Sequence, residues 1–161
     1  MRKNLVFLLA VLWQLPSMAA DRIPERLTGS WSTAESLYAG STGQTEMHLL
    51  ADGFGVLAGS TPPAQENGGA PADPGVHAPR AIIGFPFQAT LQGEELILRP
   101  LIPNAGRSLM ASDMVLKCRH ETEAASLTCK GPNGVPMVLA RRSKTVPDEV
   151  VRMIDHLRPL S

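Results

Sequence analysis

The fold of this chain is decided in the stretch Glu46-Met-His-Leu-Leu-Ala-Asp-Gly-Phe-Gly-Val-Leu-Ala58. Alternating residues flank Asp52-Gly53, which is typical of two antiparallel strands joined by a tight turn, because Gly accepts the positive φ that such turns need. A two-residue turn would place six apolar residues on one face in three facing pairs. The pairs would be Ala51 with Phe54, Leu49 with Val56, and Met47 with Ala58. We therefore expect a hairpin with one buried face.

A second hairpin is predicted downstream. The alternating run 83–89 returns through 96–98 after the turn residues Gln92-Gly93. This turn would give two facing pairs, Ala89 with Leu96 and Phe87 with Leu98. Pro86 lacks a backbone N–H and cannot donate to a strand ladder, so it marks a bulge or an open side of the sheet.

A third hairpin is predicted between residues 113 and 130. Folding about Glu123-Ala124 would give two facing pairs, Cys118 with Cys129 and His120 with Leu127. A turn at 131–134 then leads into a last strand over 135–141. Period-two alternation thus runs through most of the chain, and it predicts a mainly β protein built as an antiparallel meander.

One helix is expected at the C-terminus, over residues 147–158. Thr145 can cap it, and Pro147 suits its first turn. A narrow apolar stripe follows at helical spacing, and Pro159 ends it. The stripe consists of Val150, Val151, Ile154 and Leu157. Such a stripe favours a helix that closes one side or end of the sheet over a helix that binds a partner.

The first twenty residues have the pattern of a secretory signal peptide. Arg2 and Lys3 precede the short apolar run 5–13, and small residues fill 17–20. Cleavage is expected after Ala19 or Ala20. The apolar run is too short to span a membrane, and no Cys follows it to carry a lipoprotein anchor. We therefore expect a periplasmic or secreted protein with no membrane span after cleavage, and a single domain over 21–161.

Composition narrows the classes of function. The chain has 15 Lys and Arg and 15 Asp and Glu, and removal of residues 1–20 leaves 13 against 15. This near balance gives no basic surface for nucleic acid. The two cysteines of an exported chain are expected to form the disulfide Cys118–Cys129. Two thiols are too few for a metal site, and the stretch 59–79, rich in Pro, Gly and Ala, is expected to be a flexible loop.

The residues Gly29-Ser30-Trp31 stand just before the predicted strands. A Gly-x-Trp in this place resembles the first strand of the lipocalins and of the wider calycin group. That resemblance implies a small calycin-like barrel, closed or partly open, in which Trp31 closes one end. It also implies that an Arg of the last strand packs over the Trp, a role that falls to Arg141 or Arg142. The alternative is a β-sandwich with Trp31 in its core.

We count seven or eight short strands, including one over 31–38. If the barrel is hollow, its ligand-facing interior is expected to consist of seven apolar residues. They are Met47, Leu49, Val56, Phe85, Phe87, Leu96 and Leu98. Short strands and few aromatics favour a filled core instead.

No motif of an active site is found. The chain lacks a Gly-x-Ser-x-Gly elbow, a His-Glu-x-x-His zinc motif and a phosphate-binding loop. The four histidines are scattered, and His48 and Asp52 would lie roughly 13 Å apart along one strand. We expect no catalytic residues, no metal and no cofactor.

The function expected from these observations is non-catalytic binding by an exported protein. Small bacterial protease inhibitors and periplasmic lysozyme inhibitors are similarly built, so the resemblance favours an inhibitor or immunity-type protein that binds another exported protein. Its contacts would come from 21–26, 38–43 and 104–108. The alternatives are a carrier of a small apolar ligand and a structural protein of the envelope.

Overall fold

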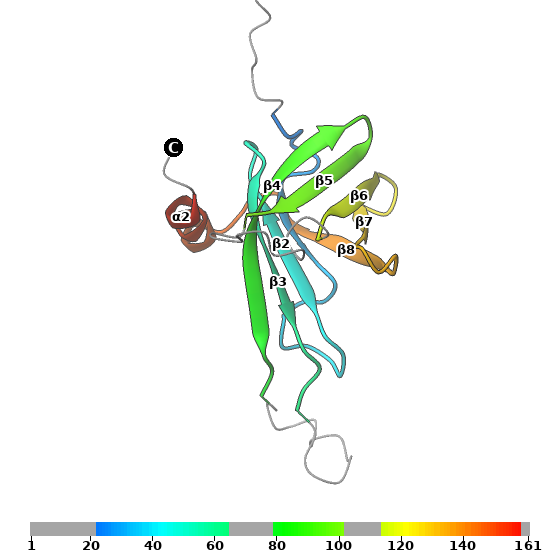
Figure 1. Cartoon of the computed structure of the whole chain (residues 1–161), viewed down its shortest axis with the longest axis vertical. Coiled ribbons are helices and arrows are strands. Elements are labelled where there is room, and N and C mark those ends of the chain that lie inside the picture. Colours follow the sequence, from blue (N-terminus) through cyan, green and yellow to red (C-terminus); the bar gives the residue numbers. More distant parts are fainter. Residues whose placement is uncertain (1–21, 65–78, 102–113, 159–161) are drawn as a thin grey trace, which may run out of the picture.

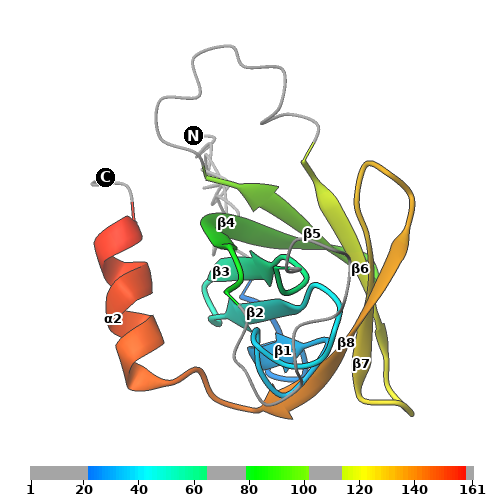
Figure 2. The same cartoon turned by 90° about the horizontal axis from the view of Figure 1, so that it is seen from below.

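A computed structural model describes residues 22–64, 79–101 and 114–158. Within them, eight antiparallel strands follow one another around a closed barrel, and one helix lies outside it (Figures 1 and 2). The strands are β1 (Gly29–Ser32), β2 (Thr45–Leu49), β3 (Phe54–Ser60), β4 (Ile82–Gln92), β5 (Glu95–Pro100), β6 (Leu116–Glu121), β7 (Ser126–Lys130) and β8 (Pro136–Ser143), and the helix is α2 (Asp148–Leu157).

The barrel closes because β1 pairs with β8 as well as with β2. Every other strand pairs with its neighbours in the chain, so no strand in the described residues is left as an edge. The predicted meander with a C-terminal helix is confirmed, and the barrel is closed rather than partly open. The sandwich alternative is wrong, because two separate sheets would not join the first strand to the last.

The register predicted for the β2–β3 hairpin is wrong by one residue. Leu49 lies opposite Gly55, and Met47 lies opposite Leu57. The connection has three residues rather than two. Leu50 and Gly53 close a turn in which the N–H of Gly53 donates to the Leu50 carbonyl at 3.1 Å, and Gly53 has a φ of 85°. This is the turn followed by a left-handed residue that three-residue hairpins commonly use.

This one-residue slip reverses the faces of β3, because successive side chains of a strand point to opposite sides. Leu57 therefore joins the interior with Met47 and Leu49. Val56 faces outward, opposite His48, on the strand that α2 contacts. The prediction that Val56 lines the interior is wrong.

The β4–β5 hairpin differs from its prediction by two residues. Its turn lies at Gly93-Glu94, so that Ala89 faces Leu98 and Leu91 faces Leu96. A slip of two residues keeps every side chain on its predicted face. The inward placement of Phe87 and Leu96 therefore holds although their expected partners do not.

The β6–β7 hairpin has the predicted register. Cys118 faces Cys129, His120 faces Leu127, and the two cysteines form a disulfide. The bond ties neighbouring strands of the barrel wall, and both cysteines are buried in the core.

The helix begins one residue later than expected. Pro147 occupies the N-cap position, and no side chain caps the helix, so the predicted cap by Thr145 is wrong. The Thr145 backbone N–H donates to the Ser143 hydroxyl at 3.1 Å instead. Of the apolar stripe, Ile154 is buried whereas Leu157 is exposed. The helix contacts β3 and covers part of the outer wall (Figure 2).

Two predicted segments have different limits. The first strand covers Gly29–Ser32 rather than 31–38, and Tyr38 is exposed in the turns that follow it. Of the expected loop 59–79, Gly59 and Ser60 belong to β3, and the Thr61 N–H still donates to the Ala81 carbonyl at 2.9 Å. Residues 65–78 lie outside the described residues, as do the predicted signal peptide 1–20, the expected contact segment 104–108 and Pro159.

The two ends of the barrel differ. The closed end carries the turns β2–β3, β4–β5 and β6–β7, and residues 22–28 pack against it. The other end, called here the open end, carries the connections β1–β2, β3–β4, β5–β6 and β7–β8. There β3 ends at Ser60 and β4 begins at Ile82, and β2 reaches the same level, with Thr45 opposite Gly59 (Figure 1).

Candidate binding site at the open end of the barrel

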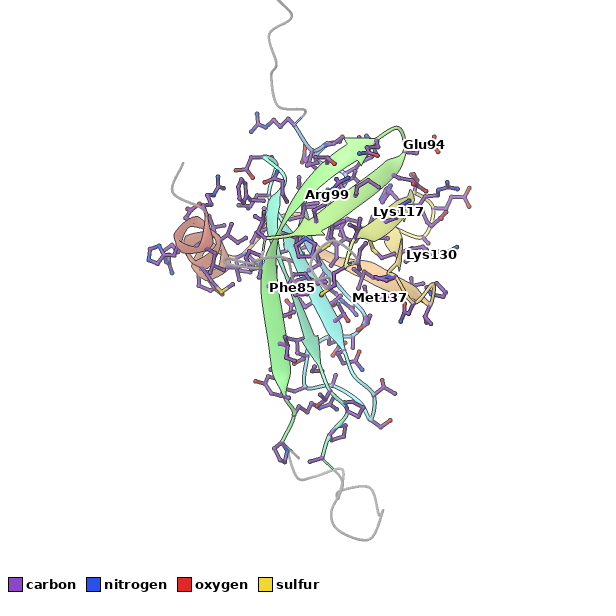
Figure 3. All side chains as sticks on the ribbon, viewed as in Figure 1. Phe85, Glu94, Arg99, Lys117, Lys130 and Met137 are labelled. Atoms are coloured by element: carbon purple, nitrogen blue, oxygen red, sulfur yellow. A yellow bond between two sulfur atoms is a disulfide. The ribbon has the colours of Figure 1, made fainter. Side chains whose placement is uncertain are left out.

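The open end contains an apolar pocket of about 410 Å³. Its lining comes from five strands and the residues that continue them, with Leu57, Phe85, Leu116 and Met137 as the largest side chains inside the barrel. Phe85 of β4 and Met137 of β8 approach the pocket from opposite walls (Figure 3). Its volume is within the usual range of small-molecule sites.

A second pocket of about 460 Å³ adjoins the first. Leu116 and Met137 line both pockets. The second pocket continues over the turn between β7 and β8, where Val135 and Pro136 contribute to its wall. The two pockets, which share Leu116 and Met137, are together called the hollow here.

Large apolar side chains are exposed around this hollow. Ile83 is 70% exposed, Val135 63% and Tyr38 62%, and Ile82 and Val138 are also exposed. Ile83 and Val135 line the hollow itself, Ile82 precedes Ile83 on β4, and Tyr38 lies in the β1–β2 connection at the open end, whereas Met153 and Leu157 lie on α2. A group of exposed apolar side chains of this kind marks a place where a ligand or a partner binds.

Most of the predicted interior residues do not reach the hollow. Five of the seven are fully buried in the filled core. They are Met47, Leu49, Phe87, Leu96 and Leu98. Phe85 alone of the predicted set lines the pocket, and Val56 faces outward. The expectation of a filled core therefore holds for the closed half, while the open half keeps a cavity.

Sequence reasoning missed four large apolar residues of the first pocket. Leu57 was missed because the hairpin register was wrong by one. Ile83, Leu116 and Met137 share the strand parity of core residues on β4, β6 and β8, which was the available signal. Parity tells which face a residue takes, but it does not tell whether that level of the barrel is filled or empty.

Trp31 fills the closed end, fully buried, and its ring nitrogen donates to the Leu27 carbonyl at 3.0 Å. The Arg141 guanidinium stands over the Trp31 ring, 5.3 Å from its centre, and donates to the carbonyls of Glu25 and Thr28 at 2.8 Å each. Arg141 is thus the residue that packs over the Trp.

The other two residues implied for this end have separate roles. Arg142 donates instead to the Ser32 hydroxyl at 2.8 Å. Gly29 has a φ of 107°, and a Cβ there would overlap the Ser143 carbonyl oxygen, so a side chain at this position would strain the β1–β8 closure.

No family model, curated protein or solved structure matches this chain.

Of the segment 21–26, expected to contact a partner, the structure describes 22–26, which lies on the closed end. The N–H of Ile23 donates to the Ala51 carbonyl at 2.8 Å, and Ile23 is buried in the core. The segment 38–43, also expected to contact a partner, lies at the open end, where Arg80 donates to the Thr42 carbonyl at 2.7 Å. Only the second segment is placed near the hollow.

Ser30, His48 and Glu46 form a chain of polar contacts on the outer wall. The Ser30 hydroxyl lies 2.9 Å from His48 Nδ1, and His48 Nε2 lies 3.1 Å from a Glu46 carboxylate oxygen. Burial lowers the pKa of His48, and the charge of Glu46 partly opposes this effect. The order of groups is that of a nucleophile, a base and a carboxylate.

These contacts nevertheless fasten neighbouring segments of the chain to one another. Ser30 is 5% exposed, and its hydroxyl also donates a hydrogen bond to the Thr145 carbonyl at 3.3 Å. None of the three residues lines either pocket. The contacts hold the segment that leads into α2 against β1 and β2. Sequence reasoning missed them because it paired His48 with Asp52 along one strand rather than with Ser30 across two.

Within the described residues, no group of three or more His, Cys, Asp or Glu side chains is placed to hold a metal ion. No helix in the same part of the chain combines the length and the apolar character needed to cross a membrane.

Proposed function

We propose that this chain is an exported, non-catalytic binding protein that takes an apolar ligand into the hollow at its open end. The observation that carries the proposal is a pocket of about 410 Å³ with Phe85, Leu116 and Met137 in its walls, in a barrel whose other half is filled. Binding apolar surface there would remove both the ligand and these side chains from water.

The test is a titration of the purified protein with N-phenyl-1-naphthylamine, a neutral fluorophore that brightens in apolar surroundings. Met137→Trp would fill the hollow from β8 and should abolish the fluorescence increase. Met153→Trp makes the same substitution at an exposed position of α2 and should leave it unchanged. Equal binding by both variants and by the unaltered protein would place the ligand elsewhere and overturn the proposal.

A protein partner is the second candidate, and the exposed side chains of Ile83, Val135 and Tyr38 favour it. An inhibitor or immunity-type protein could insert an apolar residue of its target into the hollow. A photo-crosslinking residue at position 83 should then capture one exported protein, and the same residue at position 153 should not. The captured protein should then be purified. It should bind the unaltered protein in solution and should not bind the Ile83→Asp variant.

Export is part of the proposal and has its own support. The disulfide Cys118–Cys129 joins two buried residues, and such bonds persist in oxidising compartments. We expect the protein recovered from its native host to begin at residue 20 or 21, as measured by intact mass. Recovery of the uncleaved chain in a reducing compartment would contradict export.

A further inference from the structure

Three neighbouring strands each place a cation beside the open end. Arg99 is the second-last residue of β5, Lys117 is the second residue of β6, and Lys130 is the last residue of β7. All three side chains are exposed. Their positions are equivalent, because each lies within two residues of the strand end that borders the hollow.

The register brings these cations close together. Lys117 faces Lys130 directly across β6 and β7, and it faces Ile97 on β5, two residues from Arg99. Facing residues on one side of an antiparallel pair have their Cβ atoms about 5 Å apart, and like charges in that arrangement repel. In the described ranges no carboxylate forms an ion pair with any of the three.

The remaining cation of this wall shows the contrast. Arg119 lies on the same face of β6, two residues toward the closed end, and it stands 3.7 Å from a carboxylate oxygen of Glu95. The wall therefore carries a paired charge near the closed end and a group of unpaired positive charges near the hollow.

The same cations adjoin the walls of the hollow. Lys117 follows Leu116, which lines both pockets, and Lys130 stands between Cys129 and Gly131, which line the second. Figure 3 shows Lys117, Lys130 and Met137 one after another along this side of the barrel. Lys side chains carry their charge at the end of a long flexible stem, so both ammonium groups can bend over the rim.

We propose that the ligand of the hollow is an anionic amphiphile, whose apolar chain lies between Phe85 and Met137 and whose carboxylate or phosphate head is held by Lys117, Lys130 and Arg99. This inference rests on the proposed function and adds the charge of the ligand to it. An anionic head would relieve the repulsion between the two lysines, which nothing in the described protein offsets.

The test compares two ligands with the same chain length, dodecanoate and dodecanol, each displacing the neutral fluorophore at concentrations where it is monomeric. In Lys117→Gln/Lys130→Gln, dodecanoate should bind about 3- to 30-fold more weakly, which is the loss of one exposed ion pair per lysine. Dodecanol should change by less than about twofold. Added salt should weaken dodecanoate binding to the unaltered protein and leave dodecanol unaffected.

Arg119→Gln is the matched control, because it removes a cation from the same face of the same strand without touching the rim. It should leave both affinities unchanged. Circular dichroism of all variants checks that the barrel is folded, which is expected since the substituted side chains are exposed.

Each remaining outcome contradicts one part of the proposal: the anionic head, the proposed function on which it rests, or the single-molecule ligand. If both ligands bind and the lysine variant loses neither, the anionic head is wrong and the proposed function stands. If the fluorophore binds in the hollow but neither ligand displaces it, the anionic amphiphile is wrong and the proposed function stands; if the fluorophore itself does not bind, the proposed function falls with it. If monomeric dodecanoate does not bind but the protein sediments with phosphatidylglycerol vesicles and not with phosphatidylcholine vesicles, the cations serve a lipid surface, and the single-molecule ligand is wrong.

Discussion

At the closed end, the β2–β3 turn depends on Gly53. Its φ of 85° is unfavourable for residues with a Cβ, and a Cβ placed there would come within 2.5 Å of the Ala89 carbonyl oxygen. The same backbone accepts a hydrogen bond from the Ala89 N–H at 2.7 Å, which joins the β2–β3 turn to β4. One glycine thus sets both a turn and a contact between strands.

We expect Gly53→Ala to lower the free energy of unfolding by about 2–4 kcal/mol, from the positive φ and the overlap together. Gly93→Ala is the control, because Gly93 also has a positive φ but a Cβ there would meet nothing within 4 Å. Gly93→Ala should lower the free energy of unfolding by only about 1 kcal/mol. Urea unfolding of both variants measures the difference, and equal losses would show that the overlap with Ala89 relaxes without cost.

Arg141 has a similar role for the Trp at the barrel end. It combines the stacking on Trp31 with two hydrogen bonds to carbonyls of the N-terminal segment. Arg141→Met should cost about 2–3 kcal/mol, because both contributions are lost and two carbonyl groups lose a donor. Arg142→Met removes one hydrogen bond to Ser32 and should cost about 1 kcal/mol. If Arg142→Met lowers the free energy of unfolding by more than Arg141→Met does, Arg142 rather than Arg141 is the main stabiliser of the barrel end at Trp31.

At the scale of elements, the three hairpins differ in how far their sequences define them. For β6–β7, the cysteine pair and the turn residues agree on one register, and the structure has it. For β4–β5, the turn shifts by one position and the register by two, so the faces remain correct. For β2–β3, Asp52-Gly53 fits a turn of two or of three residues, and the choice between them reverses the faces of β3.

The β6–β7 hairpin should depend on its disulfide. Closing a loop of this length stabilises a fold by somewhat under ~3 kcal/mol on the chain-entropy account. Reduction should therefore lower the melting temperature of the unaltered protein, while Cys118→Ala/Cys129→Ala should start low and not respond to reductant. A drop on reduction in the double variant would show that the reductant acts on something other than this bond.

Arg158 fastens the C-terminal end of the helix to the barrel. Arg158 reaches Asp52 of the β2–β3 turn at 2.6 Å, and its guanidinium stands 4.6 Å from the centre of the Phe54 ring. Both charged groups are partly exposed, so the ion pair contributes no more than about 1 kcal/mol.

We expect Arg158→Ala to speed amide hydrogen exchange in α2 by up to about tenfold while leaving β6 and β7 unchanged. Arg152→Ala is the control, since Arg152 is exposed on the same helix and forms no ion pair with the described residues. Faster exchange throughout the barrel would mean that α2 is required for the whole fold rather than attached to it.

At the scale of the whole molecule, stability should depend on pH through two histidines. Burial lowers the pKa of His48, and burial with the nearby cations Arg26 and Arg141 lowers the pKa of His120. The unfolded chain then binds protons more readily than the folded protein. The free energy of unfolding should therefore fall as the pH drops from about 7 through the ordinary His pKa of about 6.5, and level off below the folded values.

Chemical unfolding at pH 7.5 and pH 5 measures this loss. His48→Gln should reduce it, because the neutral side chain gains no proton in either state, whereas His156→Gln on the exposed face of α2 serves as the control. If His48→Gln loses as much free energy of unfolding between pH 7.5 and pH 5 as the unaltered protein does, groups other than His48 cause the effect.

Local patterns were sufficient for three features: alternation for the strand order, helical spacing for the C-terminal helix, and the cysteine pair in its hairpin for the disulfide. These depend on contacts between residues close in the chain, where period-two alternation and turn residues act directly. The Gly29 and Trp31 pair also pointed to an end of the barrel that is filled by the Trp. Local patterns did not decide whether the barrel closes, because the pairing of β1 with β8 joins residues more than a hundred positions apart.

Tertiary structure alone decided where the barrel is hollow. Phe85 and Phe87 follow the same alternation along β4, yet only Phe85 lines the pocket, whereas Phe87 is buried in the filled core. The cavity depends on how strands of unequal length are staggered around the barrel, which no single strand encodes. The predicted β6–β7 register already places Lys117 opposite Lys130, but only the closed barrel places this pair beside the apolar hollow. A sequence shows which side chains face inward or outward, but closure of the sheet determines which of them meet at one end.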